Sequence, residues 1–258
     1  MEVRDQVRGC LLIAYRDLLR FWKFKHWLFS QIVMNLADVV IFALVFNNIV
    51  NRQYIPDYVK FMSTGVLAVS VFASSFSIAR EVGAEIRREV VQYLLTLPTS
   101  RNAVIAGRII GGTLRGLIYQ TAFIALNLAV VGIPSPKQSV IILYTSFMLA
   151  AAMSALAIAI TTSTRDFNLQ ATFRALTYYM LFFFSNVFYP REVLALRFPG
   201  ALATIVTHTP ISLAAEVYRW SFGYSEYINP TALYELTLWA FTLLVTASLL
   251  YRRNISGR

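Results

Sequence analysis

The stretch Glu85-Ile-Arg-Arg-Glu-Val-Val-Gln-Tyr-Leu-Leu-Thr-Leu-Pro-Thr-Ser-Arg101 lies between the second and the third of six long apolar segments. It carries charges of both signs, its apolar residues recur at helical spacing, and a proline closes it. The flanking segments are long enough to cross a bilayer, whereas this stretch is not. It therefore predicts a short amphipathic helix that a membrane bundle presents on one side of the membrane.

The composition of the chain indicates that lipid is its main solvent. Of its 258 residues, 57% are hydrophobic and 14% are charged, and the mean hydropathy is +0.59. A soluble domain of this length could not bury that much apolar surface, whereas a membrane protein leaves it in contact with lipid. We expect an all-α integral membrane protein with one domain over residues 1–258, divided into an interfacial helix (1–26), a six-span bundle (27–251) and a cytosolic tail (252–258).

Six segments can span the membrane, because a hydrocarbon core of about 30 Å needs about 20 helical residues. The fourth is long enough to tilt, and the fifth barely reaches across. Their expected bounds are Trp27 to Ile49, Tyr58 to Ala79, Gly116 to Ile133, Ser139 to Thr164, Phe173 to Tyr189 and Leu233 to Tyr251.

The basic residues indicate the orientation of these spans. The formal net charge is +10, but the charges are confined to the gaps between apolar segments, which excludes a nucleic-acid-binding surface. Seventeen of the 23 Lys and Arg residues fall on one side of the membrane and six on the other. The positive-inside rule then predicts a multi-pass protein of a prokaryotic cell membrane with both termini in the cytosol.

Residues 3–22 precede the first span and have the pattern of a helix that lies in the cytosolic interface. Its apolar residues recur at helical spacing, and arginines fill the opposite face. A solvated basic tail is the alternative. The apolar face comprises Val3, Val7, Leu11, Ala14, Leu18 and Phe21.

Small residues mark two places where helices are expected to pack closely, because membrane helices associate through close van der Waals contact. They indicate a compact bundle and carry no information about a substrate. These residues are Gly107, Gly111, Gly112 and Gly116 before the third span, and Ala151, Ala155 and Ala159 in the fourth.

The segment between the fifth and the sixth span is apolar but interrupted. Pro190, Pro199 and Pro210 divide residues 190–232 into pieces too short to cross the membrane, since proline lacks an amide donor and stops helices. We expect short re-entrant helices that enter the outer leaflet and return. A loop that caps the outer face of the bundle is the alternative.

Asp38 is the one acidic residue expected deep within a span, where a charge costs about 2.5–3.5 kcal/mol on insertion scales. It should face the bundle interior or a wet cavity, and Asn35 lies one turn before it on the same face. This pair predicts a polar patch on a transport pathway. The alternative is a hydrogen-bonded pair that fastens the first span to a neighbour. A secondary, ion-coupled transporter that uses Asp38 is a rival function.

Aromatic residues crowd the fifth span. Tyr179, Phe182 and Phe183 are candidates to line a pathway, and an aromatic lining would suit an amphiphilic or lipid-like cargo. A stripe of aromatic rings that faces lipid is the alternative for any one of them.

The sequence contains no legible catalytic or nucleotide-binding motif. It lacks the Gly-x4-Gly-Lys-[Ser/Thr] loop that cradles ATP phosphates, and His26 and His208 are too far apart to indicate a metal site. No set of nucleophile, base and acid is evident, which counts against a membrane-embedded enzyme. We therefore expect neither catalysis nor a cofactor in this chain. A structural scaffold without transport is a further alternative.

Three features of the chain occur together and in a fixed order. The first is an interfacial helix before six spans. The second is the stretch from Tyr93 to Arg101, which contains Leu-Leu-Thr-Leu-Pro-Thr-Ser-Arg, followed by Gly107-Arg108. The third is the run of spaced prolines after the fifth span, which ends in Glu216 and Arg219. Across nearly its whole length, the chain resembles the permease subunits of the type-2 ABC exporters, which favour Gly-Lys at the position of Gly107-Arg108.

The resemblance implies a permease that forms a homodimer, or a heterodimer with a similar chain, and binds two ABC ATP-binding subunits. ATP and Mg²⁺ would bind those partner subunits. The permease would export a drug-, lipid- or glycan-like substrate along a path near spans one, two and five. A coupling helix over about Ala84–Leu95 would dock in the ATPase; a helix resting on the inner leaflet is the alternative. The candidate docking residues are Glu85, Arg88, Glu89, Gln92, Tyr93 and Leu94.

Overall fold

The computed structural model describes residues 3–47, 49–50, 52–90, 93–94, 99–164 and 166–256. Within these ranges the chain forms helices and connecting turns and contains no strand, as the all-α prediction requires. The helices are α1 (Val3–Lys23), α2 (Lys25–Phe46), α3 (Tyr58–Phe76), α4 (Ile78–Arg87), α6 (Arg101–Val130), α7 (Pro136–Ser163), α8 (Phe167–Phe183), α9 (Arg191–Arg197), α10 (Gly200–Thr207), α11 (Pro210–Ser221) and α12 (Ala232–Ser256).

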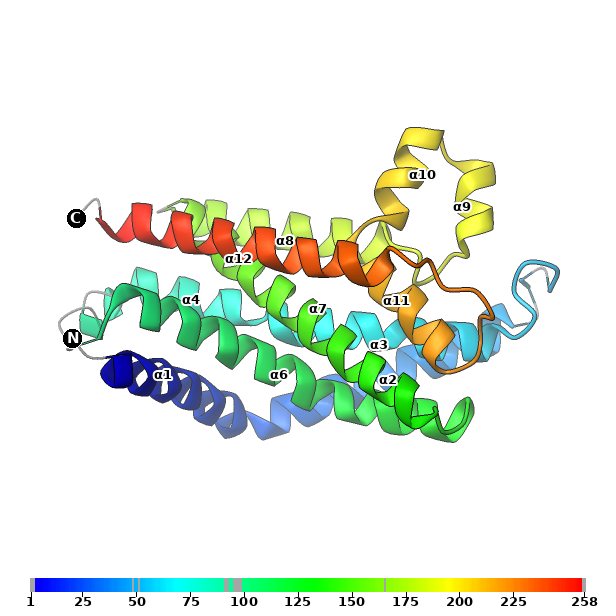
Figure 1. Cartoon of the computed structure of the whole chain (residues 1–258), viewed down its shortest axis with the longest axis horizontal. Helices are drawn as coiled ribbons and strands as arrows, with labels where there is room; N and C mark the ends of the chain where they lie inside the picture. Colours follow the sequence, from blue (N-terminus) through cyan, green and yellow to red (C-terminus); the bar gives the residue numbers. More distant parts are fainter. Residues whose placement is uncertain are drawn as a thin grey trace.

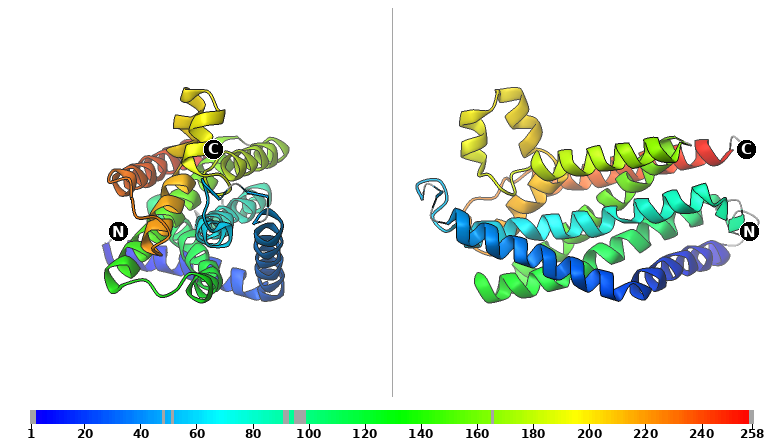
Figure 2. Two further views of the ribbon diagram at one scale, coloured as in Figure 1. Left: turned by 90° about the vertical axis from the view of Figure 1, so that its right-hand side faces the viewer. Right: turned by 180° about the vertical axis from the view of Figure 1, so that it is seen from behind.

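The long helices run along the longest axis of the molecule (Figure 1). Both termini lie at one end of the bundle, together with α4 and the start of α6. The short helices α9 and α10 project from the bundle near the opposite end (Figures 1 and 2). The segments that the sequence assigns to opposite sides of a membrane therefore lie at opposite ends of the bundle.

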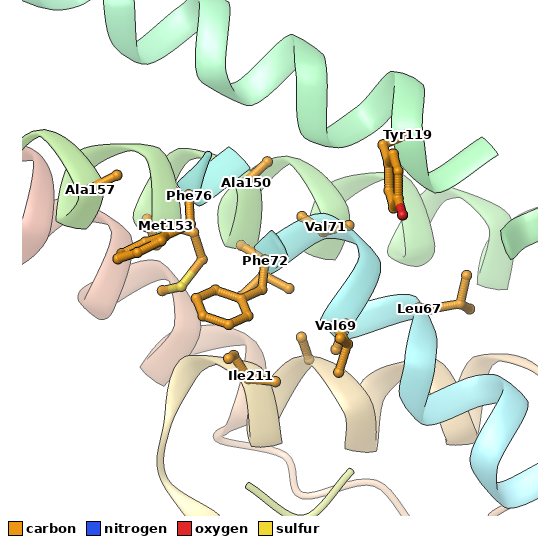
Figure 3. Close-up of a cluster of buried hydrophobic side chains, with 14 of the residues drawn as sticks. Leu67, Val69, Val71, Phe72, Phe76, Tyr119, Ala150, Met153, Ala157 and Ile211 are labelled. Atoms are coloured by element: carbon orange, nitrogen blue, oxygen red, sulfur yellow. The ribbon is translucent and has the colours of Figure 1, made fainter. Parts of the chain in front are cut away.

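The central helix of the bundle is α3. Nearly all of its residues are buried, and it packs against α6, α7 and α11, with α2 alongside. The ring of Phe72 lies near Met153 of α7 and Ile211 of α11 (Figure 3), and its centre is 4.9 Å from that of the Tyr178 ring of α8. Close packing of this kind holds helices together in lipid, where hydrophobic exclusion does not act between them.

Five of the described helical stretches are long and apolar enough to cross a membrane, and they correspond to the first four predicted spans and the sixth. In place of the fifth, α8 has 17 residues and ends at Phe183, because Phe184 leaves the helical region at φ −90° and ψ 56°. The total of six spans stays a prediction. The five stretches are Leu28–Phe46, Tyr58–Arg87, Arg101–Val130, Pro136–Ser163 and Ala232–Arg253.

Two helical stretches are longer than the spans predicted from the apolar segments. The second predicted span continues through α4 to Arg87, and α6 begins at Arg101 rather than at Gly116. Ser100 caps α6, because its hydroxyl accepts a hydrogen bond from the backbone N–H of Ala103 at 3.1 Å. The added turns carry charged residues that hydropathy assigns to gaps between spans, and these residues pair across helices, as described below.

The helix predicted over residues 84–95 is interrupted. α4 ends at Arg87, and Glu89 has a φ of 58°, a left-handed conformation that does not continue an α-helix. Arg88 and Glu89 form a turn, after which Val90, Tyr93 and Leu94 are again helical. The expected continuous helix is therefore the end of α4, a turn and a further helical piece.

The apolar face predicted for α1 is divided between two sides. Ala14 and Phe21 are buried against the bundle, together with Ile13, whereas Val7 and Leu11 are 54% and 58% exposed. α1 packs along α6. Its outer side thus keeps large apolar residues exposed, which fits a helix in contact with lipid. Its place in the membrane interface stays a prediction.

The glycines of α6 confirm the predicted close packing. A Cβ on Gly107 would lie 2.6 Å from the carbonyl oxygen of Cys10 and 2.8 Å from the Cβ of Ile13, both in α1. A Cβ on Gly112 or Gly116 would meet the hydroxyl of Ser154 in α7 or of Ser75 in α3, respectively. At Gly107, where the contacts are backbone and a Cβ, no side chain fits unless α1 moves.

Three short helices follow α8, and each begins at one of the three prolines that are predicted to divide this segment. Pro190 and Pro199 are the N-caps of α9 and α10, and Pro210 is in the first turn of α11. Proline suits the start of a helix because no amide donor is needed there. α11 packs against α3, α7 and α12. The short helices are confirmed, and their entry into the outer leaflet stays a prediction.

We predict that Gly107→Ala lowers the free energy of unfolding by about 1–3 kcal/mol, because the added methyl group would meet backbone and a Cβ of α1 that cannot rotate away. Gly200→Ala is the matched control, since a Cβ there has no atom within 4 Å. Unfolding by sodium dodecyl sulfate in mixed micelles, followed by circular dichroism, measures both. Equal unfolding midpoints for the two variants would contradict the prediction.

Candidate functional site

Glu85 is the centre of a charged cluster between α1, α4 and α6. Its carboxylate accepts hydrogen bonds from the guanidinium groups of Arg108, of Arg20 at 2.5 Å and of Arg16 at 3.3 Å. Glu85 is 4% exposed, and Arg108 is fully buried. One acidic residue of α4 therefore holds two basic residues of α1 and one of α6.

A second ion pair of the cluster lies one turn earlier on α4. Arg115 of α6 donates from Nη1 to Oε1 of Glu81 at 2.5 Å and from Nη2 to Oε2 at 2.8 Å. Its Nη2 also donates to the backbone carbonyl of Asp17 in α1, and its guanidinium lies 5.2 Å from the centre of the Phe21 ring. Paired parallel bonds of this kind fix orientation as well as distance.

The two ion pairs make α1, α4 and α6 one unit at the end of the bundle where the termini lie (Figure 1). Only the turn residue Ser77 separates α4 from the central helix α3. Removing one partner of a buried ion pair costs about 3–5 kcal/mol, so the joint resists separation. The end of α4 is therefore joined to α3 along the chain and to α1 and α6 through ion pairs.

The candidate docking residues divide into exposed and inward-facing ones. Arg88 and Glu89 are exposed at the turn, and Tyr93 is 70% exposed. Leu94 is 8% exposed. The carboxylate of Glu85 is buried and bound by three arginines, and its predicted contact with a partner subunit stays a prediction.

The sequence predicts a role for Glu85 but not the arginines that bind it. Glu81 and Glu85 are four residues apart, and Arg108 and Arg115 are seven apart, so each pair lies on one face of its helix. This matching spacing is the signal that could reveal the cluster. This spacing carries no such information if the residues are assigned to a loop between spans, because only a helix places them on one face.

An apolar groove of about 630 Å³ lies between α2 and α8. The C-terminal ends of these helices line it, and these ends lie away from the termini of the chain (Figure 1). Phe182 and Phe183 line it from α8, and Phe42 and Phe46 line it from α2. Tyr179 is 60% exposed, and its ring centre lies 6.3 Å from that of Phe183. The three aromatic candidates of the predicted pathway are thus neighbours on α8.

A polar pocket of about 950 Å³ adjoins this groove, and Tyr54 and Pro190 line both. Glu216 and Arg219 line the pocket from α11. Burial raises the pKa of the Glu216 carboxyl, and the positive charges of Arg191 and Arg219 oppose this shift in part. A polar compartment and an aromatic compartment are therefore next to each other.

Glu216 and Arg219 also hold the connection between α8 and α9. Nη2 of Arg219 donates to the carbonyl oxygens of Asn186 at 3.0 Å and Val187 at 2.9 Å. The Glu216 carboxylate accepts a hydrogen bond from Nδ2 of Asn186 at 2.9 Å. These bonds satisfy polar groups that are freed where α8 ends, and they fix that end on α11.

Asn35 donates from Nδ2 to the phenol oxygen of Tyr119 at 2.7 Å and so links α2 to α6. This contact favours the alternative in which Asn35 fastens the first span to a neighbour. The side chain of Asp38 and the whole of Gln92 lie outside the described residues, and the roles expected for them stay predictions.

We predict that Glu85→Gln lowers the free energy of unfolding by about 3–5 kcal/mol, because the fully buried Arg108 would lose its counter-charge. Glu89→Gln removes the same charge at an exposed position four residues away and should change stability by less than about 0.5 kcal/mol. Detergent-induced unfolding of the two variants checks this. Similar losses for both would show that the buried pair contributes no more than a surface charge.

The comparison with protein families matches residues 8–223 to the family described as ABC-2 type transporter. The match extends from α1 to just past the end of α11 and includes the charged cluster and the aromatic groove. The comparison with curated proteins gave no match. Since the matched region covers most of the chain and includes four of the five long apolar helices found among the described residues, the chain belongs to the ABC-2 type transporter family and is a membrane permease subunit of an ABC transporter.

Proposed function

We propose that the chain is the permease of an ABC exporter for an amphiphilic substrate of the drug, lipid or glycan type. Two such chains, or this chain and a similar one, would form the path, and two ABC ATP-binding subunits would bind and hydrolyse ATP with Mg²⁺. The observation that carries this proposal is the charged cluster, which joins α1, α4 and α6 next to an exposed turn, while α4 itself follows directly on the central helix α3.

Docking of the ATP-binding subunit would take place on the exposed part of the connection between α4 and α6. Arg88 and Glu89 offer charged groups there, and Tyr93 offers an exposed aromatic ring. Aromatic residues and arginines are the usual anchors of protein interfaces. The inward-facing Leu94 would support this surface from below.

Transmission would follow from the ion pairs. When the ATP-binding subunits close, they would push the turn at Arg88 and Glu89 and with it the end of α4. Glu85 and Glu81 would carry this movement to Arg108 and Arg115, and so to α6 and α1. Because α4 continues into α3, the central helix would shift against α7 and α11.

The aromatic groove and the polar pocket support an amphiphilic substrate. An apolar tail would lie against Phe182 and Phe183, and a polar group would lie towards Glu216 and Arg219. Arg-rich segments at the end with the termini support a cytosolic location for that end in a prokaryotic cell membrane. The groove and the pocket, at the opposite end, would then open outwards, as export requires.

We predict that Tyr93→Ala weakens binding of the ATP-binding subunit about 30-fold, since loss of an interface anchor costs about 2 kcal/mol. Tyr227→Ala is the control, because Tyr227 is similarly exposed and lies in the connection between α11 and α12. Titration of the detergent-purified permease with a labelled ABC ATP-binding subunit gives both dissociation constants. Equal constants for the two variants would remove Tyr93 from the docking surface.

We predict ATP-dependent accumulation of a short-chain fluorescent phosphatidylcholine inside inside-out vesicles that contain the complex. Phe183→Ala should lower the initial rate about tenfold, because it removes an aromatic contact of the groove. Phe241→Ala on α12 should leave the rate unchanged, since Phe241 is 65% exposed and does not line the groove. Accumulation without ATP or without the ATP-binding subunit would contradict the proposal.

A further inference from the structure

A second apolar groove, of about 490 Å³, lies on the other side of the bundle from α8, between α6, α7 and α12. α6 and α12 both pack against α7 and touch each other only slightly, so α7 forms the floor of this groove. Ile109 and Ile110 line it from α6, Phe147 from α7 and Leu244 from α12. The aromatic pathway candidates are not among its lining residues.

The mouth of this groove is basic. Arg252 of α12 lines it and donates from Nε and Nη2 to Oδ1 of Asn102, at 3.0 and 2.6 Å, so its guanidinium is held across the opening. Within the described residues, Nη1 of Arg252 has no hydrogen-bond partner. Arg253 is exposed beside it, and none of the residues that line the groove is acidic.

The groove is long enough to hold the acyl chain of one lipid. The residues of α12 from Leu236 to Tyr251 are uncharged, and the change to arginine at Arg252 indicates a boundary of the hydrocarbon core on this helix. From Asn102 to Leu114 the groove follows α6 for about 18 Å, at 1.5 Å per residue. Half of a hydrocarbon core measures about 15 Å, so the length of the groove matches that of one leaflet.

We propose that this groove binds one anionic phospholipid of the leaflet on the side of the termini. An acyl chain would lie along Ile109, Ile110 and Phe147, and the phosphate would accept hydrogen bonds from Arg252. Guanidinium groups suit phosphate because their donors form a planar fork, and basic pockets between membrane helices on the cytosolic side are typical sites for anionic lipids.

A bound lipid would fasten α12 to α6, which pack closely only through α7. The site is separate from the proposed substrate path, so neither the direction of transport nor the ATP-binding subunit enters its test. Full-length protein in sealed vesicles with the lipid in both leaflets also removes any dependence on the orientation of the chain.

The test uses Phe147→Trp as a reporter within the groove, since Phe147 is 50% exposed and lines it. Vesicles of phosphatidylcholine contain increasing fractions of phosphatidylglycerol or phosphatidylcholine brominated on the acyl chains, which quench tryptophan on contact. The fluorescence of the parent protein is subtracted to remove its own four tryptophans. We expect half-maximal quenching at a fraction of brominated phosphatidylglycerol about fivefold below that of brominated phosphatidylcholine, as one arginine contact with an anionic lipid gives.

Arg252→Gln, added to the reporter, should abolish this preference, because glutamine can still bond to Asn102 but carries no charge. Arg253→Gln is the matched control, with the same charge removed one residue away and outside the lining, and should keep the preference. Ala106→Phe should lower quenching by both lipids, since Ala106 lines the groove and a large ring would fill it.

Equal quenching by the two lipids in the reporter protein, or equal losses in Arg252→Gln and Arg253→Gln, would overturn the proposal in favour of general attraction to a basic surface. A second measurement needs no reporter. Native mass spectrometry of detergent-purified protein should detect one bound phosphatidylglycerol on the parent chain and on Arg253→Gln and none on Arg252→Gln. Loss from both variants, or retention by both, would overturn it equally.

Discussion

The buried ion pair between Glu85 and Arg108 limits how the helices at this end of the bundle can be arranged. A charged pair inside a membrane protein persists only when both partners are held together, because either one alone would be strongly destabilising. Here the pair joins the end of α4 to the start of α6, and Arg16 and Arg20 add α1 to the same carboxylate. Three helices therefore share this one buried carboxylate.

The charged cluster attaches the connection between α4 and α6 to the rest of the bundle. Ion pairs hold the helices on either side of this connection, and its first residues, Arg88 and Glu89, form an exposed turn with Glu89 in the left-handed region. α3, which α4 continues, is the most buried of the long helices. An exposed element that is rigidly attached to the core can pass on movement, whereas a flexible loop would absorb it.

Much of the fold could be predicted from the sequence, because lipid makes hydropathy and proline position strong signals. The apolar runs gave four of the spans and most of α12, and Pro190, Pro199 and Pro210 marked the starts of the short helices. The glycines before Gly116 predicted close packing of α6. The order of the sequence motifs indicated the ABC-2 type transporter family. These features depend on local chemistry, which a single sequence contains.

The rest depends on contacts between distant residues. Glu85 belongs by pattern to a docking helix, but only the approach of Arg108 and of α1 shows that its carboxylate points inward. Hydropathy likewise ends the second span early, because it cannot register that the charges of Glu81 and Arg115 cancel each other. The buried side of α1 was missed in part for the same reason, since glycines of α6 decide which side packs.

The most direct test of the joint is a double-mutant cycle on ATP-driven transport, with Glu85→Gln, Arg108→Gln and the double variant in the complete complex. We expect each single change to lower the transport rate strongly while the ATP-binding subunit still binds, and the double variant to lose less than the sum of the two single losses, because Arg108 is no longer left without its counter-charge. Normal transport in either single variant, or additive losses in the double variant, would contradict a role for the pair in transmission.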